Sequence, residues 1–299
     1  MPESQHAVTL LDGGTGRELA RIGAPFRQPE WSALALIEAP EYVLKCHENY
    51  IAAGADVITS NSYALVPFHL GAVRFTRDGK RLAALAGRLA LDAKQQAKRS
   101  VQVAGSLPPV MGSYRPDLFD RTQAKAILSV LIDALKPSVD LWLGETLSAV
   151  AEADLLLELL HADARPKWVS FTLDDRSDPN APTLRSGEPV VVLYDLIHKH
   201  SINALLFNCS QPEIMAGALR QLRTQPLPSA LRLGVYANAF PAQNGEEAAN
   251  EHLHDIRADL TPQRYLEFAQ QWVTLGASII GGCCGIGPEH IEQLRQHWP

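Results

Sequence analysis

The sequence predicts an α/β fold, a closed (β/α)8 or TIM barrel of parallel strands surrounded by helices. Short apolar runs alternate with amphipathic stretches in about eight units along the 299 residues. Eight such units in this length favour a closed barrel over an open, doubly wound sheet. No linker or low-complexity segment divides the chain, so we expect residues 1–299 to form one domain.

Each expected strand is a short run of β-branched or apolar residues, and each expected helix has apolar residues at helical spacing. In chain order, the expected strands are residues 8–11, 56–60, 101–105, 139–144, 167–173, 204–207, 231–236 and 278–280. The helices that follow them are expected at residues 41–53, 81–98, 123–135, 149–160, 189–200, 213–222, 262–275 and 288–297.

Composition narrows the class of protein. The net charge of -6 argues against binding to nucleic acid or to anionic membranes. Residues 1–7 do not resemble a signal peptide, and no apolar run approaches the roughly 20 residues of a membrane span. Four cysteines are too few for a secreted disulfide scaffold, so we expect a cytoplasmic protein with reduced thiols. The sequence leaves the oligomeric state open.

Three cysteines follow predicted strands. Cys283 and Cys284 lie in the run Gly-Gly-Cys-Cys-Gly at 281–285, and Cys209 follows Phe-Asn. Three thiols at strand ends indicate one soft metal ion, which we expect to be zinc, with a coordination position open to substrate. The alternative is that they are small, buried apolar side chains. Cys46 lies on a predicted helix, where we expect it to serve in packing.

The adjacent cysteines require a bend, because consecutive side chains on a strand point to opposite faces. Cys283 and Cys284 can share one metal ion only if the backbone turns between them. We expect Gly281, Gly282 and Gly285 to supply the turn, because glycine enters positive φ without steric cost. A disulfide between the two neighbours would be strained.

Polar residues end nearly every predicted strand, and in such barrels these ends form the active site. Those we expect to converge are Asp12, Asn61, Ser106, Glu145, Thr172, Cys209, Asn238 and Cys283. Three of them also suit a purely local role, Asp12 in a turn, Glu145 at a helix N-terminus and Asn238 as a loop cap.

A zinc ion bound by three thiolates has a formal charge of -1, which makes it a poor Lewis acid. It can still hold a further thiol deprotonated at pH 7, where free thiols with a pKa of about 8.5 are mostly protonated. The chemistry that suits such a site is activation of a substrate thiol as a nucleophile.

The chain resembles the homocysteine S-methyltransferase family. The resemblance rests on segments in the same order along nearly the whole chain, at residues 11–19, 53–63, 144–146, 207–210 and 281–291. It implies that Cys209, Cys283 and Cys284 hold zinc. It also implies that homocysteine thiolate bound there takes a methyl group from a donor and becomes methionine.

The resemblance also implies substrate contacts. The carboxylate of Glu145 would bind the amino group of homocysteine, with Asp12 beside it. Tyr63 and Trp31 match aromatic wall positions, where they could make cation–π contacts with a sulfonium donor. Each could instead be an ordinary core or surface aromatic. Asn238 could approach the zinc or the substrate.

The methyl donor is the least determined feature. Family members use S-methylmethionine, S-adenosylmethionine, betaine or a methylfolate. The chain ends at Pro299, without room for cobalamin and folate modules and without the extension of betaine-using members. S-methylmethionine and then S-adenosylmethionine are therefore expected. The segment 240–261 is either a lid or a solvated loop, and His252 and His254 within it are expected to be solvated.

Other functions remain open. The first is a non-catalytic zinc-thiolate protein for metal binding or redox sensing, which would leave Asp12, Asn61 and Glu145 unexplained. The second is methyl transfer to another thiol. The third is a phosphate-binding barrel enzyme using Gly281 and Gly282, although no lysine or arginine flanks them.

Overall fold

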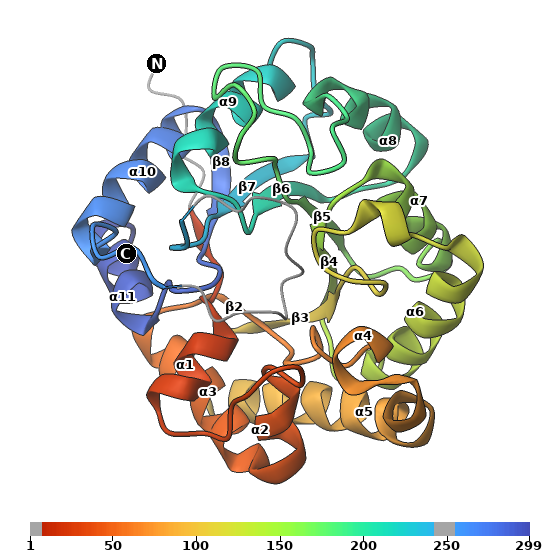
Figure 1. Cartoon of the computed structure of the whole chain (residues 1–299). Coiled ribbons are helices and arrows are strands. Elements are labelled where there is room, and N and C mark those ends of the chain that lie inside the picture. The colour runs from red at the N-terminus through yellow and green to blue at the C-terminus, as the bar shows by residue number, and fades with distance from the viewer. Residues whose placement is uncertain (1–7, 242–254) are drawn as a thin grey trace.

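The computed structural model describes residues 8–241 and 255–299 and confirms the TIM barrel. Eight parallel strands pair in the order β1-β8-β7-β6-β5-β4-β3-β2, and together they surround the centre of the molecule (Figure 1). A single parallel bridge between Leu11 and Val57 joins β1 to β2. The strands are β1 Thr9–Leu10, β2 Val57–Thr59, β3 Gln102–Leu107, β4 Leu141–Leu147, β5 Lys167–Phe171, β6 Ala204–Asn208, β7 Arg232–Tyr236 and β8 Ala277–Ile280.

An outer ring of helices covers the strands (Figure 1). It consists of α3 Pro40–Ala53, α5 Ala72–Gln96, α6 Arg121–Leu135, α7 Val150–Leu159, α8 Leu193–Lys199, α9 Pro212–Leu222, α10 Pro262–Thr274 and α11 Pro288–His297. A 3-10 turn, η2 Val190–Val192, leads into α8. Each ring helix overlaps a helix expected from the sequence.

Alternate residues of the strands build two apolar cores. In β6, Leu205 and Phe207 belong to the larger core under the helices, while Ala204 and Leu206 belong to the core inside the barrel. The alternation follows from the two-residue period of a strand. Because both faces are covered, the strands read as continuous apolar runs, which is why the sequence located them well.

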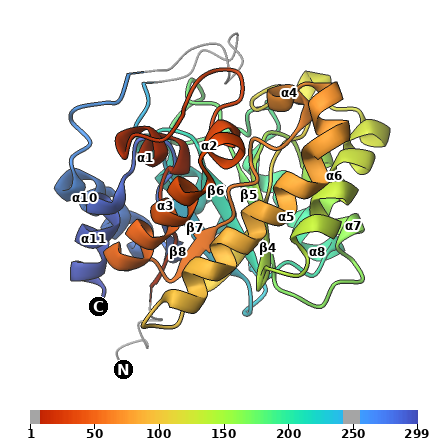
Figure 2. The same ribbon diagram turned by 90° about the horizontal axis from the view of Figure 1, so that it is seen from below.

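The differences from the sequence expectation lie in the loops that follow β1 and β2. These loops contain three short helices that the sequence did not predict, α1 Thr15–Arg21, α2 Ala33–Glu38 and α4 Pro67–Leu70, grouped at one end of the barrel (Figure 2). In addition, α5 begins at Ala72 rather than at 81. Its first turns are mostly exposed, so they carry little apolar periodicity.

Candidate functional site

A pocket opens at the carboxyl ends of the strands. Its empty space is about 990 Å³, part of it open solvent. Eight of the predicted residues line it: Asp12, Trp31, Asn61, Tyr63, Glu145, Cys209, Cys283 and Cys284. Ser106 and Thr172, which were also expected to converge there, do not line it. The lining also includes residues to which the sequence assigned no role, among them His69, Ser113, Tyr114, Tyr236 and Phe240.

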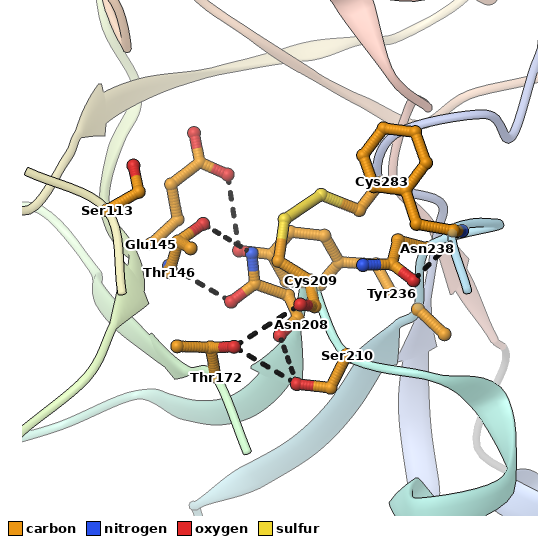
Figure 3. The surroundings of a disulfide bond; sticks show 12 residues. Ser113, Glu145, Thr146, Thr172, Asn208, Cys209, Ser210, Tyr236, Asn238 and Cys283 are labelled. Atoms are coloured by element: carbon orange, nitrogen blue, oxygen red, sulfur yellow. Dashed lines mark hydrogen bonds between the residues drawn. A yellow bond between two sulfur atoms is a disulfide. The ribbon is translucent and has the colours of Figure 1, made fainter. Parts of the chain in front are cut away.

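The three cysteines meet at one side of this pocket. Their sulfur atoms all lie within 4.8 Å of one another, although the cysteines come from the ends of β6 and β8. Cys209 and Cys283 are joined by a disulfide bond (Figure 3). Cys284 is a free thiol. Burial raises the pKa of the Cys284 thiol to about 11, so without a cation nearby it stays protonated at neutral pH.

The glycines around the cysteines act differently from the sequence expectation. Gly285 alone of the three has positive φ, at 83°. Gly281 and Gly282 are needed for space: a Cβ there would lie 2.4 Å from Leu11 Cβ and 2.2 Å from Ile286 Cγ2, respectively. The left-handed conformation that turns the other cysteine loop belongs to Cys209 itself, with φ 50°.

The donor set fits a soft metal ion. Tetrahedral zinc with sulfur ligands at about 2.3 Å requires sulfur–sulfur separations of roughly 3.7 Å, which this cluster can meet with small side-chain adjustments. Metal binding by all three sulfurs first requires reduction of the Cys209–Cys283 bond, because the ligands must be thiolates. The cluster is therefore a possible metal site in the reduced protein.

Asp12 has a structural role beside the pocket. Its Oδ2 accepts hydrogen bonds from the backbone N–H of Thr59 at 2.7 Å and from the Thr59 hydroxyl at 3.0 Å. These bonds reinforce the seam between β1 and β2, where one backbone bridge closes the barrel. Burial raises the pKa of Asp12 to about 8, and the nearby charge of Glu145 adds to the rise.

Glu145, on β4, points into the pocket between two hydroxyl donors. Ser106 donates to its Oε1. Tyr236 donates to its Oε2 at 3.3 Å (Figure 3). Burial raises the pKa of Glu145 to about 7, and the two hydrogen bonds oppose the rise. Asp12 and Glu145 thus form a carboxylate pair whose negative charge a bound cation would stabilise.

Asn208 supports this geometry, and the sequence analysis gave it no role. It is fully buried; its Oδ1 accepts from the Thr146 N–H at 3.0 Å and from the Ser170 hydroxyl at 2.7 Å. Its Nδ2 donates to the Thr146 hydroxyl at 2.8 Å. These bonds hold Thr146 at φ 59° and so fix the backbone beside Glu145. The sequence signal that could have indicated this role is a polar asparagine at the end of an otherwise apolar strand.

Aromatic side chains form much of the remaining wall. The Tyr63 hydroxyl lies 2.6 Å from Ser113 Oγ, and Trp31, with φ 53°, packs edge-on against Phe26. Tyr114 comes from the segment 108–120, to which the sequence assigned no role. Its hydroxyl donates to the Cys209 carbonyl at 3.4 Å.

Three expectations fall elsewhere. Asn238 does not line the pocket; its Oδ1 accepts from the Phe240 N–H, and its Nδ2 is buried without a partner among the described residues. His252 and His254, with most of the segment 240–261, lie outside the described residues. Cys46 is completely buried in the core, as expected.

Fold and site together define a class: a TIM barrel with a possible three-cysteine metal site beside a buried and a half-buried carboxylate. The chain belongs to the homocysteine S-methyltransferase family, whose model matches residues 9–298.

Characterised relatives cover nearly the whole chain. Homocysteine S-methyltransferase 1 of Brassica oleracea var. italica is 28% identical, over 96% of this chain and 92% of its own length. Homocysteine S-methyltransferase of Escherichia coli is 30% identical, over 96% and 94%. The crystal structure of the homocysteine methyltransferase MmuM from Escherichia coli in its metallated form superposes with a TM-score of 0.78 at 29% identity, covering 97% of this chain and 96% of that one.

Among the described residues, no helix is both long enough and apolar enough to cross a membrane.

Proposed function

We propose that this protein is a zinc-dependent methyltransferase that moves a methyl group from a sulfonium donor to the thiolate of L-homocysteine and so forms methionine. The observation that carries the proposal is the convergence of three cysteine sulfurs with the carboxylates of Asp12 and Glu145 in one pocket. Zinc held by Cys209, Cys283 and Cys284 would keep the acceptor thiol deprotonated at neutral pH.

The carboxylates would orient the acceptor. An ammonium group of homocysteine next to Glu145 and Asp12 would form charge-assisted hydrogen bonds and return both pKa values toward the ordinary range. The hydroxyls of Ser106 and Tyr236 hold Glu145 in position for this contact. Fixing the amino end of the substrate would place its sulfur toward the cysteines.

The donor would lie against the aromatic wall. Tyr63 and Trp31 would present ring faces to a sulfonium cation, whereas the Arg185 guanidinium already lies over the Tyr114 ring. The sulfonium loses its charge during methyl transfer, so aromatic faces bind it without trapping it as strongly as a carboxylate would. S-methylmethionine is the first expected donor, and S-adenosylmethionine is the second.

Domain organisation and compartment belong to the same proposal. Residues 1–299 act as one domain, because the pocket draws residues from the segments that follow the first and the last strand of the barrel. The protein works in a reducing compartment such as the cytoplasm, because the cysteines bind metal only as thiolates.

The test is methionine formation by reduced, zinc-loaded protein from L-homocysteine and S-methylmethionine, compared with chelator-treated protein. We expect methionine with zinc and little or none after chelation. Cys284→Ser should lose both zinc and activity, whereas Cys46→Ala, the matched control in the core, should keep both. Zinc binding without methionine from any sulfonium donor would instead favour another thiol acceptor or a non-catalytic zinc-thiolate protein.

A further inference from the structure

His69 in the pocket wall has no part in the chemistry of the thiol or the carboxylates. It lies on α4, is 4% exposed, and lines the pocket. Its Nδ1 lies 2.9 Å from the carbonyl oxygen of Pro29. A carbonyl only accepts hydrogen bonds, so Nδ1 carries the proton.

The second ring nitrogen is therefore an acceptor. Burial lowers the pKa of His69, so the ring is neutral at physiological pH and Nε2 has a free lone pair. Nε2 makes no hydrogen bond to a described residue, so it is free to accept one from a ligand. Pro29, whose carbonyl accepts from Nδ1, lines an outer groove and not the pocket, whereas His69 lines both. Nε2 is therefore the ring nitrogen left to accept from a ligand in the pocket.

Asn61 offers a second acceptor in the same wall. Its Nδ2 donates to the Ser32 carbonyl at 3.0 Å, which leaves Oδ1 without a partner in the described chain. The side chain is 3% exposed and lines the pocket. Both side chains are more than nine-tenths buried, and each presents an acceptor with no hydrogen bond to a described residue from a position that lines the pocket. Two such acceptors in one pocket wall suit a ligand with N–H groups.

One short loop positions both acceptor side chains through its backbone carbonyls. The carbonyls of Pro29 and Ser32 that anchor His69 and Asn61 belong to the same short segment, with Trp31 between them. The acceptor pair therefore borders the aromatic wall assigned to the sulfonium, on a segment distinct from the Asp12 and Glu145 positions.

We propose that His69 Nε2 and Asn61 Oδ1 bind the α-ammonium group of the methyl donor and so select sulfonium donors that are amino acids. This inference rests on the proposed function. Both S-methylmethionine and S-adenosylmethionine carry this ammonium on a short chain from the sulfonium. A negative charge next to the reacting sulfonium would stabilise its ground state and so slow methyl transfer. A neutral acceptor pair binds the ammonium group without adding such a charge.

Two substitutions separate the functional role from a structural one. His69→Asn keeps a donor for the Pro29 carbonyl at the position of Nδ1 but removes the acceptor at the position of Nε2. His69→Gln places an amide oxygen near Nε2. The exposed His161, substituted as His161→Asn, is the matched control.

The measurements are KM values for S-methylmethionine, for S-adenosylmethionine, for homocysteine, and for 4-(dimethylsulfonio)butanoate, which lacks only the ammonium group. For His69→Asn we expect KM for S-methylmethionine to rise about tenfold to a hundredfold. The values for homocysteine and for the des-amino donor should stay within about twofold, and His69→Gln should recover most of the loss. If 4-(dimethylsulfonio)butanoate is not a substrate, its inhibition constant is compared between the wild type and the variants in place of KM.

Asn61→Ala tests the second acceptor and should give the same selective loss. The proposal is overturned if His69→Asn raises KM equally for donors with and without the ammonium group, or if it raises KM for homocysteine instead. It is also overturned if KM rises only for S-adenosylmethionine, because His69 would then contact the adenosine part. Wild-type protein that makes no methionine from any sulfonium donor would remove the proposed function itself. Active wild type with unselective variants would remove only this inference.

Discussion

At the scale of single residues, the burial of Glu145 makes the stability of the ligand-free protein depend on pH. Its pKa is raised to about 7 because burial disfavours the charge. The unfolded chain, with an ordinary carboxyl, loses its proton at lower pH. Stability is therefore lost as pH rises from about 4.5 through 7.

Glu145→Gln should stabilise the ligand-free protein above pH 7 by on the order of 2 kcal/mol and have little effect near pH 4. The same change should raise KM for homocysteine at least about tenfold, because the ammonium loses its charged partner. In the wild type, KM for homocysteine should fall as pH rises through 7. Urea unfolding at pH 5 and 8, with KM at the same values, tests this prediction.

The control is Glu292→Gln on the exposed surface of α11, which should change neither quantity. Equal stability of the Glu145→Gln variant and the wild type at pH 8 would show that Glu145 is well solvated. An unchanged KM would remove its assigned role.

His47 is a buried histidine away from the pocket. Both ring nitrogens are buried without a partner among the described residues, and burial lowers the pKa to about 4. Because the unfolded histidine takes up its proton near pH 6.5, stability should be full above that pH and should decrease as pH falls toward 4.

His47→Leu should remove this acid sensitivity. We expect the free energy of unfolding to decrease when the pH is lowered from 7.5 to 4.5. The decrease should be roughly 3 kcal/mol smaller in the variant than in the wild type. Chemical denaturation at both pH values measures the difference. His198→Leu, an exposed substitution on α8, should follow the wild type. The same acid loss in His47→Leu and wild type would mean that the buried ring is hydrated.

At the scale of elements, the turn from β1 into α1 packs directly on the cysteine loop. A Cβ on Gly14 would lie 2.6 Å from the Cys283 carbonyl oxygen and 2.9 Å from Cys284 Cα. Gly14 also donates from its backbone to the Ile286 carbonyl at 2.9 Å. The turn therefore fixes the position of both cysteines.

Gly14→Ala should weaken metal binding by the reduced protein at least about tenfold, because the cysteine loop must shift. Competition with a chromophoric chelator measures the affinity. Gly23→Ala is the control: its Cβ would meet nothing within 4 Å, but its φ of 87° should cost about 1 kcal/mol of stability. Metal affinity that stays unchanged in Gly14→Ala would show that the cysteine loop positions itself.

The sequence predicted the buried helices and strands more accurately than the exposed ones. The strands are covered on both faces, so their apolar runs predicted them to within a few residues. The exposed start of α5 and the short helices α1, α2 and α4 lack a continuous apolar face, and their positions depend on packing around the pocket.

At the scale of the whole molecule, the cysteine cluster connects the ends of β6 and β8, 74 residues apart in the chain. In reduced protein, bound zinc should raise the melting temperature by several degrees, because a ligand that binds the folded state at about 100 times its dissociation constant adds roughly 2.7 kcal/mol. Chelation should reverse the rise.

Oxidised protein should show little response to zinc, because two of the three sulfurs are joined to each other. Calorimetry with and without reductant, zinc and chelator tests the prediction. Cys46→Ala should retain the zinc response from a lower baseline, because Cys46 is buried in the core. An equal response in oxidised and reduced protein would place the metal elsewhere.

The amino-acid sequence was enough to predict the barrel, the three cysteines and the main polar residues at the strand ends, because strand burial and residue type are recorded locally in the chain. Features that depend on distant contacts emerged only in the folded molecule. Folding committed Asp12 to the β1–β2 seam, left Asn238 out of the pocket wall, and brought His69 and Tyr114 into that wall. In the folded chain Gly281 and Gly282 make room for packing, whereas Cys209 adopts the left-handed turn. Such features depend on contacts between residues that are distant in the sequence and come together only when the barrel closes, so local sequence patterns do not predict them.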